Sequence, residues 1–277
     1  MAKATAVRNI RDDHQKAFLK IFNSLCGRFN RWQVWQDFVM VTAIEISNAT
    51  DKKNAPERTK TYQTIISKYS DAEQEKFAEL LGEVIMGMEQ NPDQDFLGEL
   101  YMLCELGNDA SGQFFTPYDV CRCMVEISGG SNPAAENAGF FSVSDPACGA
   151  GALLIAFANL CRRKNICYHD KVLFVAQDID LIAGLMCYIQ LSFLGCAGYE
   201  SGTITVTLMG TSSSLPYVRS LALKRKAVSL MIVDANDSAS VNVAEERCRV
   251  IKPPDITRAK AIGSESVSIF VPSLNYR

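Results

Sequence analysis

Apolar residues recur at helical spacing through the first hundred residues of the 277-residue chain. In the stretch 14–48, Phe18 and Leu25 fall on one face of a first predicted helix. Trp35 and Phe38 share a face of a second helix that follows it. We interpret these aromatic residues as the core of a helical unit rather than as a surface on which bases stack.

Residues 49–60 interrupt the apolar pattern with four basic side chains, and we expect them to form a polar loop. Such a loop is usually only solvated, although contact with a phosphate is an alternative interpretation. The run Tyr62–Tyr69 predicts a short helix after this loop. None of these segments carries a recognisable catalytic group.

Two helix-start signals follow in the sequence. Ser70 and Glu73 form an S-x-x-E capping box, which predicts that a helix begins there. Asn91 and Pro92 are an N-cap and first-turn pair, which predicts another helix over Asp93–Leu106. The beginning of the chain therefore reads as all-helical.

The pattern then alternates between strands and helices. Short apolar runs predict strands at 140–143, 172–176 and 199–208, with apolar helices at 152–160 and 181–196. This alternation predicts an α/β fold. A basic loop is expected at 161–171.

We divide the chain accordingly into three parts. They are an all-helical N-terminal domain (1–107), a Rossmann-like α/β domain (108–238) that lacks some expected motifs, and an irregular C-terminal tail (239–277).

Charge is distributed unevenly along the chain. The formal net charge is −3, but residues 1–68 carry 12 Lys/Arg against 6 Asp/Glu, and residues 69–120 carry 1 against 12. Residues 205–277 carry 10 Lys/Arg against 6 Asp/Glu. If the chain has an anionic partner, that partner should meet the two ends of the chain rather than its middle.

Cysteine and histidine usage argues against a metal site and for a reducing compartment. The ten cysteines form no C-x-x-C pair, and the only histidines are His14 and His169, so we expect no metal. Free thiols in this number indicate the cytoplasm. The N-terminus has no apolar signal core, and Leu181–Gly195 is too short to span a membrane, so we expect no membrane association.

Candidate chemistry is concentrated in the turn D-P-A-C-G-A-G, which links the first predicted strand to a helix. It has two glycines, Gly149 and Gly151, and a carboxylate, Asp145, four residues before the first. A pyrophosphate would favour bare N–H groups without a nearby anion, whereas a ligand with an ammonium group favours that anion. An ordinary strand-to-helix turn is the alternative interpretation.

This turn resembles motif I of the S-adenosylmethionine-dependent methyltransferases, in the form D-P-x-C-G-x-G that is typical of N6-adenine DNA methylases. The resemblance implies S-adenosylmethionine as the cofactor. It implies that the cofactor is held by Asp145, Pro146, Ala147, Cys148, Gly149 and Gly151.

A second motif, Q-F-F-T-P, lies upstream of the turn. In it Thr116 can cap a helix that has Pro117 in its first turn, and the preceding phenylalanines could form a hydrophobic staple. The string also resembles the motif that precedes D-P-x-C-G-x-G in adenine methylases of type I restriction-modification systems. The resemblance covers roughly residues 15–210 and implies a wall over the cofactor made by Gln113, Phe114, Phe115, Thr116 and Pro117.

A carboxylate also follows the second strand. Asp178 lies 27 residues after Gly151, where it can accept hydrogen bonds from both ribose hydroxyls. The resemblance implies the same role, although glutamate is commoner in the family. Asp180 is expected to cap the following helix. In the alternative interpretation, both carboxylates only cap that helix.

One family motif is missing from the sequence. Adenine methylases carry Asn-Pro-Pro-Tyr or Asn-Pro-Pro-Phe after the fourth strand, where it holds the flipped adenine. The nearest candidate is the strand-like run Val228–Ser238, in which Asn236 occupies the place of the asparagine without the prolines or the aromatic residue. Asn236 is therefore the one catalytic candidate.

The predicted function is S-adenosylmethionine-dependent methylation of adenine N6 in DNA, of the restriction-modification type. A cofactor-binding but inactive homologue that acts as a DNA-binding or regulatory subunit is the alternative. Methylation of a protein or small molecule is a third interpretation, which the basic ends and Q-F-F-T-P disfavour. A separate specificity subunit or another protein partner remains open, because the sequence contains no recognisable target-recognition domain.

Overall fold

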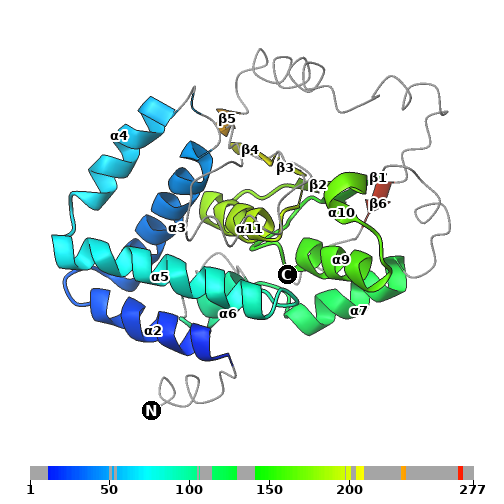
Figure 1. The fold of residues 1–277 in the computed structure, drawn as a ribbon, viewed down its shortest axis with the longest axis horizontal. Helices are drawn as coiled ribbons and strands as arrows, with labels where there is room; N and C mark the ends of the chain where they lie inside the picture. The colour runs from blue at the N-terminus through cyan, green and yellow to red at the C-terminus, as the bar shows by residue number, and fades with distance from the viewer. Residues whose placement is uncertain are drawn as a thin grey trace.

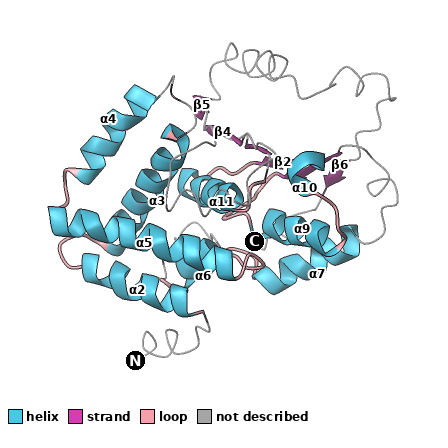
Figure 2. Cartoon of the chain, in the orientation of Figure 1, coloured by secondary structure: helices cyan, strands magenta, loops and turns pink. Residues whose placement is uncertain are grey.

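The computed structural model of the chain describes residues 12–49, 52, 55–104, 106, 114–129, 141–196, 198–200, 204–208, 232–234 and 268–270. Helices make up most of this part, and a small sheet lies behind them (Figure 2). The α/β class that the sequence predicted is therefore observed.

The first two described helices build an aromatic core. Asp12 caps α2 (Asp13–Leu25) and Asn30 caps α3 (Arg31–Asn48), each by accepting a hydrogen bond from the backbone N–H three residues on. Phe18 lies edge-on to both Trp35 and Phe38, with ring centroids 5.9 and 5.3 Å apart. All three rings are fully buried, so their interpretation as core residues is confirmed.

The expected loop at 49–60 is wrong in its second half. Helix α4 (Ala55–Ile66) begins at Ala55, and the short helix expected at 62–69 is the end of this longer one. Pro56 lies in the first turn of α4, where its missing N–H and fixed φ fit a helix start. Pro56 is therefore a helix-start signal inside the stretch predicted to be a loop.

Helix α5 (Asp71–Gln90) begins at the predicted capping box. The Ser70 N–H donates to Glu73, and the Ser70 side chain caps the N3 backbone in return. The next helix, by contrast, is shorter than expected: α6 covers Phe96–Leu103, not 93–106. Asn91 accepts from the backbone N–H of Asp93 in a local turn, and Asp95 is the residue that caps α6.

Within the described residues, the sheet contains six strands in the order β5-β4-β3-β2-β1-β6. The strands are β1 (Phe141–Asp145), β2 (Val172–Ala176), β3 (Gly198–Glu200), β4 (Ile204–Leu208), β5 (Ile232–Asp234) and β6 (Ser268–Phe270). Strands β6, β1, β2 and β3 run parallel, while β4 is antiparallel to both of its neighbours. Helices α9 (Ala152–Arg163) and α10 (Tyr168–Lys171) link β1 to β2, and α11 (Leu181–Phe193) links β2 to β3.

Three expectations about this half need correction. The run 199–208 forms two strands rather than one, because the chain reverses between β3 and β4. The basic loop at 161–171 is partly helical, since α9 extends to Arg163 and α10 ends at Lys171. Strand β6 comes from the tail that we expected to be irregular, and it pairs with β1.

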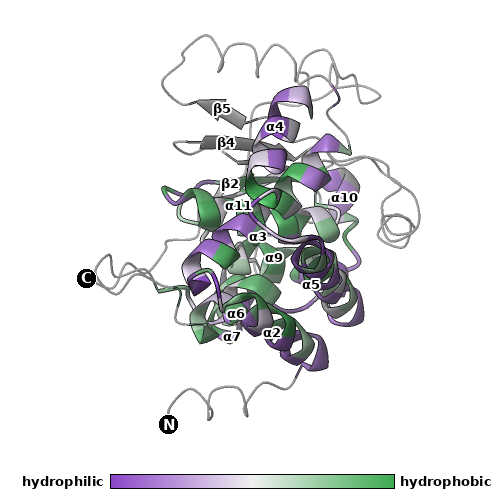
Figure 3. Cartoon of the chain, turned by 90° about the vertical axis from the view of Figure 1, so that its left-hand side faces the viewer, coloured by the Kyte–Doolittle hydropathy of each residue, from purple (hydrophilic) through white to green (hydrophobic). Residues whose placement is uncertain are grey.

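Helix α11 occupies the centre of the molecule. It contacts β4 on one side and α3, α5 and α6 on another, while α9 packs against β1 (Figure 1). Every residue from Ile182 to Phe193 is buried, which confirms that this apolar run is a buried helix. Figure 3 shows hydrophobic residues gathered on the inner helices, whereas α4 and α5 carry much of the hydrophilic surface. None of the helices in the described ranges has the length and apolarity that a membrane crossing requires.

Candidate functional site

The turn between β1 and α9 depends on two glycines in left-handed conformation. Gly149 has φ 53° and Gly151 has φ 95°, values that side-chain-bearing residues adopt at a cost. Gly151 is the N-cap of α9, and its N–H donates to the Cys148 carbonyl over 2.8 Å. The two glycines therefore allow a tight turn that leads directly into α9.

Hydrogen bonds join this turn to the end of β2. The Gln177 N–H donates to the Asp145 carbonyl over 2.9 Å, and the Cys148 N–H donates to the Gln177 carbonyl over 2.8 Å. The Gly149 N–H donates to Oδ2 of Asp178 over 2.8 Å. The carboxyl ends of β1 and β2 are thus joined by hydrogen bonds into one polar edge. The parallel pairing of the two strands places Asp145 opposite Ala176 and so brings these ends together.

Asp145 is a buried carboxyl group in a negatively charged setting. It is 4% exposed, and Oδ1 accepts the backbone N–H of Ala147 over 3.1 Å. Burial raises the pKa of Asp145 to about 6, against the opposing effect of that hydrogen bond, and the charge of Asp178 raises it further. Among the described residues, the group that acts on Asp145 electrostatically is thus another carboxylate, so the site favours a cation.

The two carboxylates after β2 have different roles. Asp180 caps α11, because Oδ1 accepts from the backbone N–H groups of Ile182 and Ala183 over 2.8 and 3.4 Å. Asp178 instead accepts from Gly149 and, through Oδ1, from the Asp180 N–H over 2.8 Å. The prediction that Asp180 caps the helix is confirmed, and the alternative that both carboxylates cap it is wrong for Asp178.

Phe115 of the Q-F-F-T-P motif lies against the glycine turn. A Cβ atom placed on Gly149 would lie 3.0 Å from Cδ1 of Phe115, so the Phe115 ring covers this glycine. The ring also stacks with Tyr101 of α6, with centroids 5.0 Å apart and an interplanar angle of 27°. Thr116 and Pro117 are exposed, and Phe114 is 69% exposed. The proximity that the order of the two motifs predicted is therefore found.

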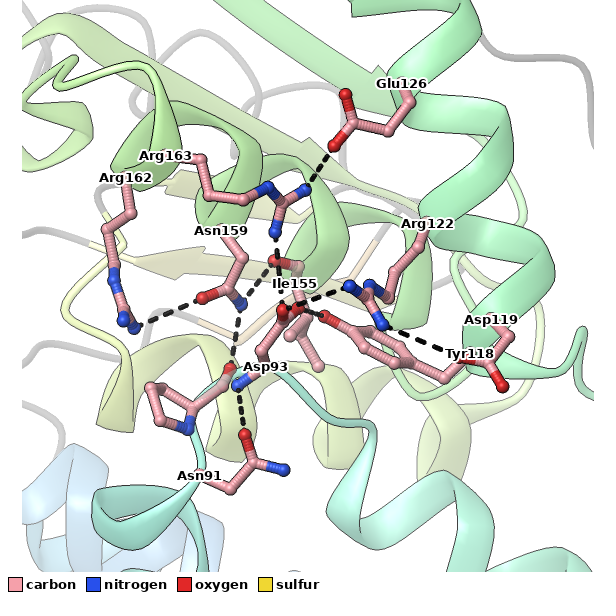
Figure 4. Close-up of polar contacts among 11 residues, drawn as sticks. Asn91, Asp93, Tyr118, Asp119, Arg122, Glu126, Ile155, Asn159, Arg162 and Arg163 are labelled. Carbon is pink, nitrogen blue, oxygen red and sulfur yellow. Dashed lines mark hydrogen bonds and ion pairs between the residues drawn. The ribbon is translucent and has the colours of Figure 1, made fainter.

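A polar cluster orients the segment that carries this motif. The Asp93 carboxylate accepts hydrogen bonds from the Tyr118 hydroxyl over 2.6 Å and from Nη1 of Arg163 over 3.3 Å (Figure 4). Nη2 of Arg163 also donates to Glu126 over 2.6 Å, and Arg122 lies 3.8 Å from Asp93. Tyr118, Arg122 and Glu126 belong to α7 (Tyr118–Gly129), and Arg163 belongs to α9. The cluster therefore fixes the start of α7 against α9.

Gly151 has a packing role that the sequence did not indicate. A Cβ atom at this position would lie 2.8 Å from Sγ of Cys187 and 3.4 Å from its Cα, both on α11. The glycine therefore lets α11 pack against the turn.

A groove of about 930 Å³ includes Phe115, Thr116 and Pro117 in its wall but none of residues 145–151 and not Asp178. Among the described residues, its other lining is acidic, with Asp12, Asp93, Asp95, Glu99 and Asp119 and one cation, Arg122. This charge disfavours DNA phosphates there. Within the described ranges, no three His, Cys, Asp or Glu side chains are grouped as a metal site would require.

Two predicted residues, Gln113 and Asn236, lie outside the described residues. One residue near the turn was missed: Gln190 of α11, whose side chain donates to the Ala150 carbonyl over 2.8 Å. The available signal was a single amide within the most apolar run of the chain. A buried amide in such a run needs hydrogen-bond partners, and the turn supplies one of them.

Residues 93–206 match the family model described as N-6 DNA methylase. The resemblance to N6-adenine DNA methylases is confirmed over this range, which is shorter than the expected 15–210. The matched range begins just before α6, ends within β4, and contains both motif segments. The N-6 DNA methylase match supports a methyltransferase function, with S-adenosylmethionine as the cofactor and DNA as the substrate that the family implies.

One solved structure from Listeria monocytogenes is described as a candidate class I S-adenosylmethionine-dependent methyltransferase. It aligns with 87% of this chain and 71% of its own, at 12% sequence identity and a TM-score of 0.36. No curated protein sequence matches the chain.

Proposed function

We propose that the chain is an S-adenosylmethionine-dependent DNA methyltransferase that acts on adenine N6 in a restriction-modification system. The observation that carries the proposal is the buried carboxyl group of Asp145 beside the glycine turn. Its electrostatic neighbour within the described part of the chain is another carboxylate, so an ammonium or sulfonium ligand would offset the negative charge of the two groups. In this proposal β1, α9, β2, α11 and β3 are the nucleotide-binding half of a Rossmann-like domain.

The residues around the turn fit this cofactor. Asp178 uses both oxygens to accept backbone N–H groups, yet each carboxylate oxygen has a further lone pair for a ribose hydroxyl. Ile179, next to it, is 91% exposed and offers an apolar surface to the purine. Phe115 and Phe114 form the wall on the side of the Q-F-F-T-P motif.

The chain itself contributes positioning and electrostatics to this reaction. The bound cofactor supplies the methyl group for direct displacement by the adenine amine, so no nucleophile on the protein is needed. Asp145 would orient the methionine end, and Asp178 the ribose. In the proposal, the amide oxygen of Asn236 accepts a hydrogen bond from the adenine amine and so raises its electron density.

A cofactor-binding but inactive homologue is the second candidate. The sequence observation in its favour is that Asp237 and Ser238 stand where the family motif has prolines, and that its aromatic residue is missing. Losing one preorganised contact to the reacting group costs about a hundredfold in rate. Losing the aromatic stack removes roughly 1–3 kcal/mol more. We therefore expect cofactor binding with slow methylation by the isolated chain.

The deciding experiment is transfer of labelled methyl groups to DNA by the purified protein, with and without host extract. Adenine N6 labelling by the wild-type protein that Asn236→Ala abolishes supports the proposed methyltransferase. Binding of S-adenosylhomocysteine without transfer under either condition supports the inactive homologue. Absence of binding by calorimetry would contradict both candidates.

A further inference from the structure

Gln190 is fully buried in the middle of α11. Both the nitrogen and the oxygen of its side-chain amide form hydrogen bonds. Nε2 donates to Oδ1 of Asp95 over 2.7 Å and to the Ala150 carbonyl over 2.8 Å. Oε1 accepts the backbone N–H of Leu97 over 3.0 Å. Because Leu97 offers only a donor and Ala150 only an acceptor, one orientation of the amide satisfies all three.

The partners of Gln190 come from two segments that are far apart in sequence. Asp95 and Leu97 belong to the start of α6, among the N-terminal helices, whereas Ala150 lies between the two left-handed glycines of the turn. The Asp95 carboxyl group is itself held in place, since Oδ1 also accepts the Gly98 N–H over 3.0 Å. A side chain at Gly98 would collide with the Asp95 carboxyl group.

These contacts fix a peptide plane that the glycines would otherwise leave free to rotate. The Ala150 carbonyl and the Gly151 N–H belong to the same planar peptide unit. Gln190 holds the carbonyl, and the Cys148 carbonyl accepts the N–H over 2.8 Å. Glycine is the residue with the most backbone freedom to lose, so this restraint sets the shape of the turn.

From this geometry we infer that Gln190, held by Asp95, is a positioning residue that preorganises the glycine turn for the cofactor. The inference rests on the proposed cofactor site and extends it, because it makes the start of α6 part of the binding apparatus. Neither side chain is required to touch the ligand. Their effect is transmitted through the carbonyl of Ala150.

The test compares two buried glutamines that both bond to α6 or its N-terminus. Gln190→Met removes the anchor of the turn. Gln15→Met is the matched control, because Gln15 on α2 is also buried and donates to Glu99 and to the Phe96 carbonyl of α6 without touching the turn. Affinity for S-adenosylhomocysteine is measured by calorimetry at a temperature where every variant is folded. Hydrogen exchange of the backbone amides at 148–152 is measured without ligand.

We expect Gln190→Met to lower the affinity by about tenfold and to speed exchange in the turn, since one buried hydrogen bond contributes on that scale. Gln15→Met should lower thermal stability while leaving both readouts at wild-type values. Equal affinity of Gln190→Met and wild type, or an equal loss in Gln15→Met, would overturn the inference. If the wild-type protein binds no S-adenosylhomocysteine, the proposed function fails. Unchanged hydrogen exchange at 148–152 in Gln190→Met would separately show that Gln190 does not restrain the turn.

A second pair covers the case in which Gln190→Met does not fold. Asp95→Asn keeps an acceptor oxygen for Gln190 and Gly98, whereas Asp95→Ala removes it. We expect Asp95→Asn to retain wild-type affinity and slow exchange in the turn, and Asp95→Ala to lose both. The same affinity and exchange in the two Asp95 variants would contradict the inference.

Discussion

The ring of Phe115 lies directly over Gly149, with Cδ1 and Cε1 3.0 and 3.1 Å from the point that a Cβ atom would occupy. A methyl group at this position would therefore have to displace the ring. The contact couples Phe115 to the turn after β1. A substitution at Gly149 should therefore shift the Phe115 ring, and a substitution at Phe115 should alter the turn.

We predict that Gly149→Ala lowers affinity for S-adenosylhomocysteine by about tenfold or more, because the new methyl group displaces Phe115. The left-handed φ should also cost about 1–2 kcal/mol of stability. Gly82→Ala in α5 is the control, since a Cβ there meets nothing within 4 Å. That control should be neutral or stabilising, by up to about 1 kcal/mol. Calorimetry and thermal unfolding measure the two effects, and unchanged affinity in Gly149→Ala would count against the contact.

The contact between Gly151 and Cys187 predicts a coupled effect on stability. Gly151→Ala should lower the melting temperature, because a Cβ atom would meet Sγ of Cys187 at 2.8 Å and the φ of 95° is strained for alanine. Cys187→Ala removes that sulfur, so the double variant should lose less stability than the sum of the two single losses. A thermal-unfolding double-mutant cycle measures the difference. Strict additivity would show that α11 does not crowd the turn.

Asp145 predicts how ligand affinity depends on pH. Its pKa in the ligand-free protein is about 6, above the ordinary value, so the carboxyl group is protonated at pH 5 and ionised at pH 7. A cationic ligand competes with that proton, so affinity should fall as pH is lowered below about 6, by up to about tenfold per unit. Asp145→Asn should bind weakly with a flat profile between pH 5 and 7. Asp119→Asn, an exposed carboxyl change, should keep the wild-type profile.

The same group has the opposite effect on the stability of the empty protein. Because the folded-state pKa of Asp145 is raised, its stabilising contribution is complete below about pH 4 and is lost as pH rises through about 6. Burial raises the pKa of Asp95 to about 6 as well, so it contributes with the same sign. The difference in unfolding free energy between wild type and Asp145→Asn, followed by denaturant titration, should therefore decrease from pH 4 to 7. A difference that increases with pH would contradict the burial of an uncompensated carboxyl group.

The two carboxylates after β2 should separate binding from stability. Asp180→Ala removes the α11 cap, and we expect it to cost about 0.5–2 kcal/mol of stability with little effect on affinity. Asp178→Ala leaves the Gly149 N–H without its partner and removes the proposed ribose acceptor, so affinity should fall about tenfold or more. Calorimetry and thermal unfolding on both variants measure the separation. Equal losses of affinity would mean that Asp178 has no distinct role.

The sequence predicted the local order of this site well, because each signal was short and had a physical cause. Gly149 and Gly151 marked the turn, Asp180 marked the α11 cap, and the spacing of apolar residues marked β2 to the residue. Family motifs supplied the pairing of Phe115 with the turn. These relationships depend on a few neighbouring residues each.

What the sequence did not reveal depends on contacts between distant segments. Asn91 carries the signal of a helix cap, but Asp95 caps α6, with its carboxyl group also bonded to Gln190 nearly a hundred residues later. The reversal between β3 and β4 likewise follows from which strands pair. Local propensity cannot rank such alternatives, because the deciding interactions are tertiary.

The hydrogen bonds from α6 to Gln190 bear on where the chain can be divided. A fragment that starts at residue 108 would remove Asp95 and Leu97 while keeping an amide in the middle of an apolar helix. Such a fragment would also uncover the face of α11 against which α3 and α6 pack. Domain exchange, or grafting of this turn onto another scaffold, therefore has to retain α3 and α6 together with α11.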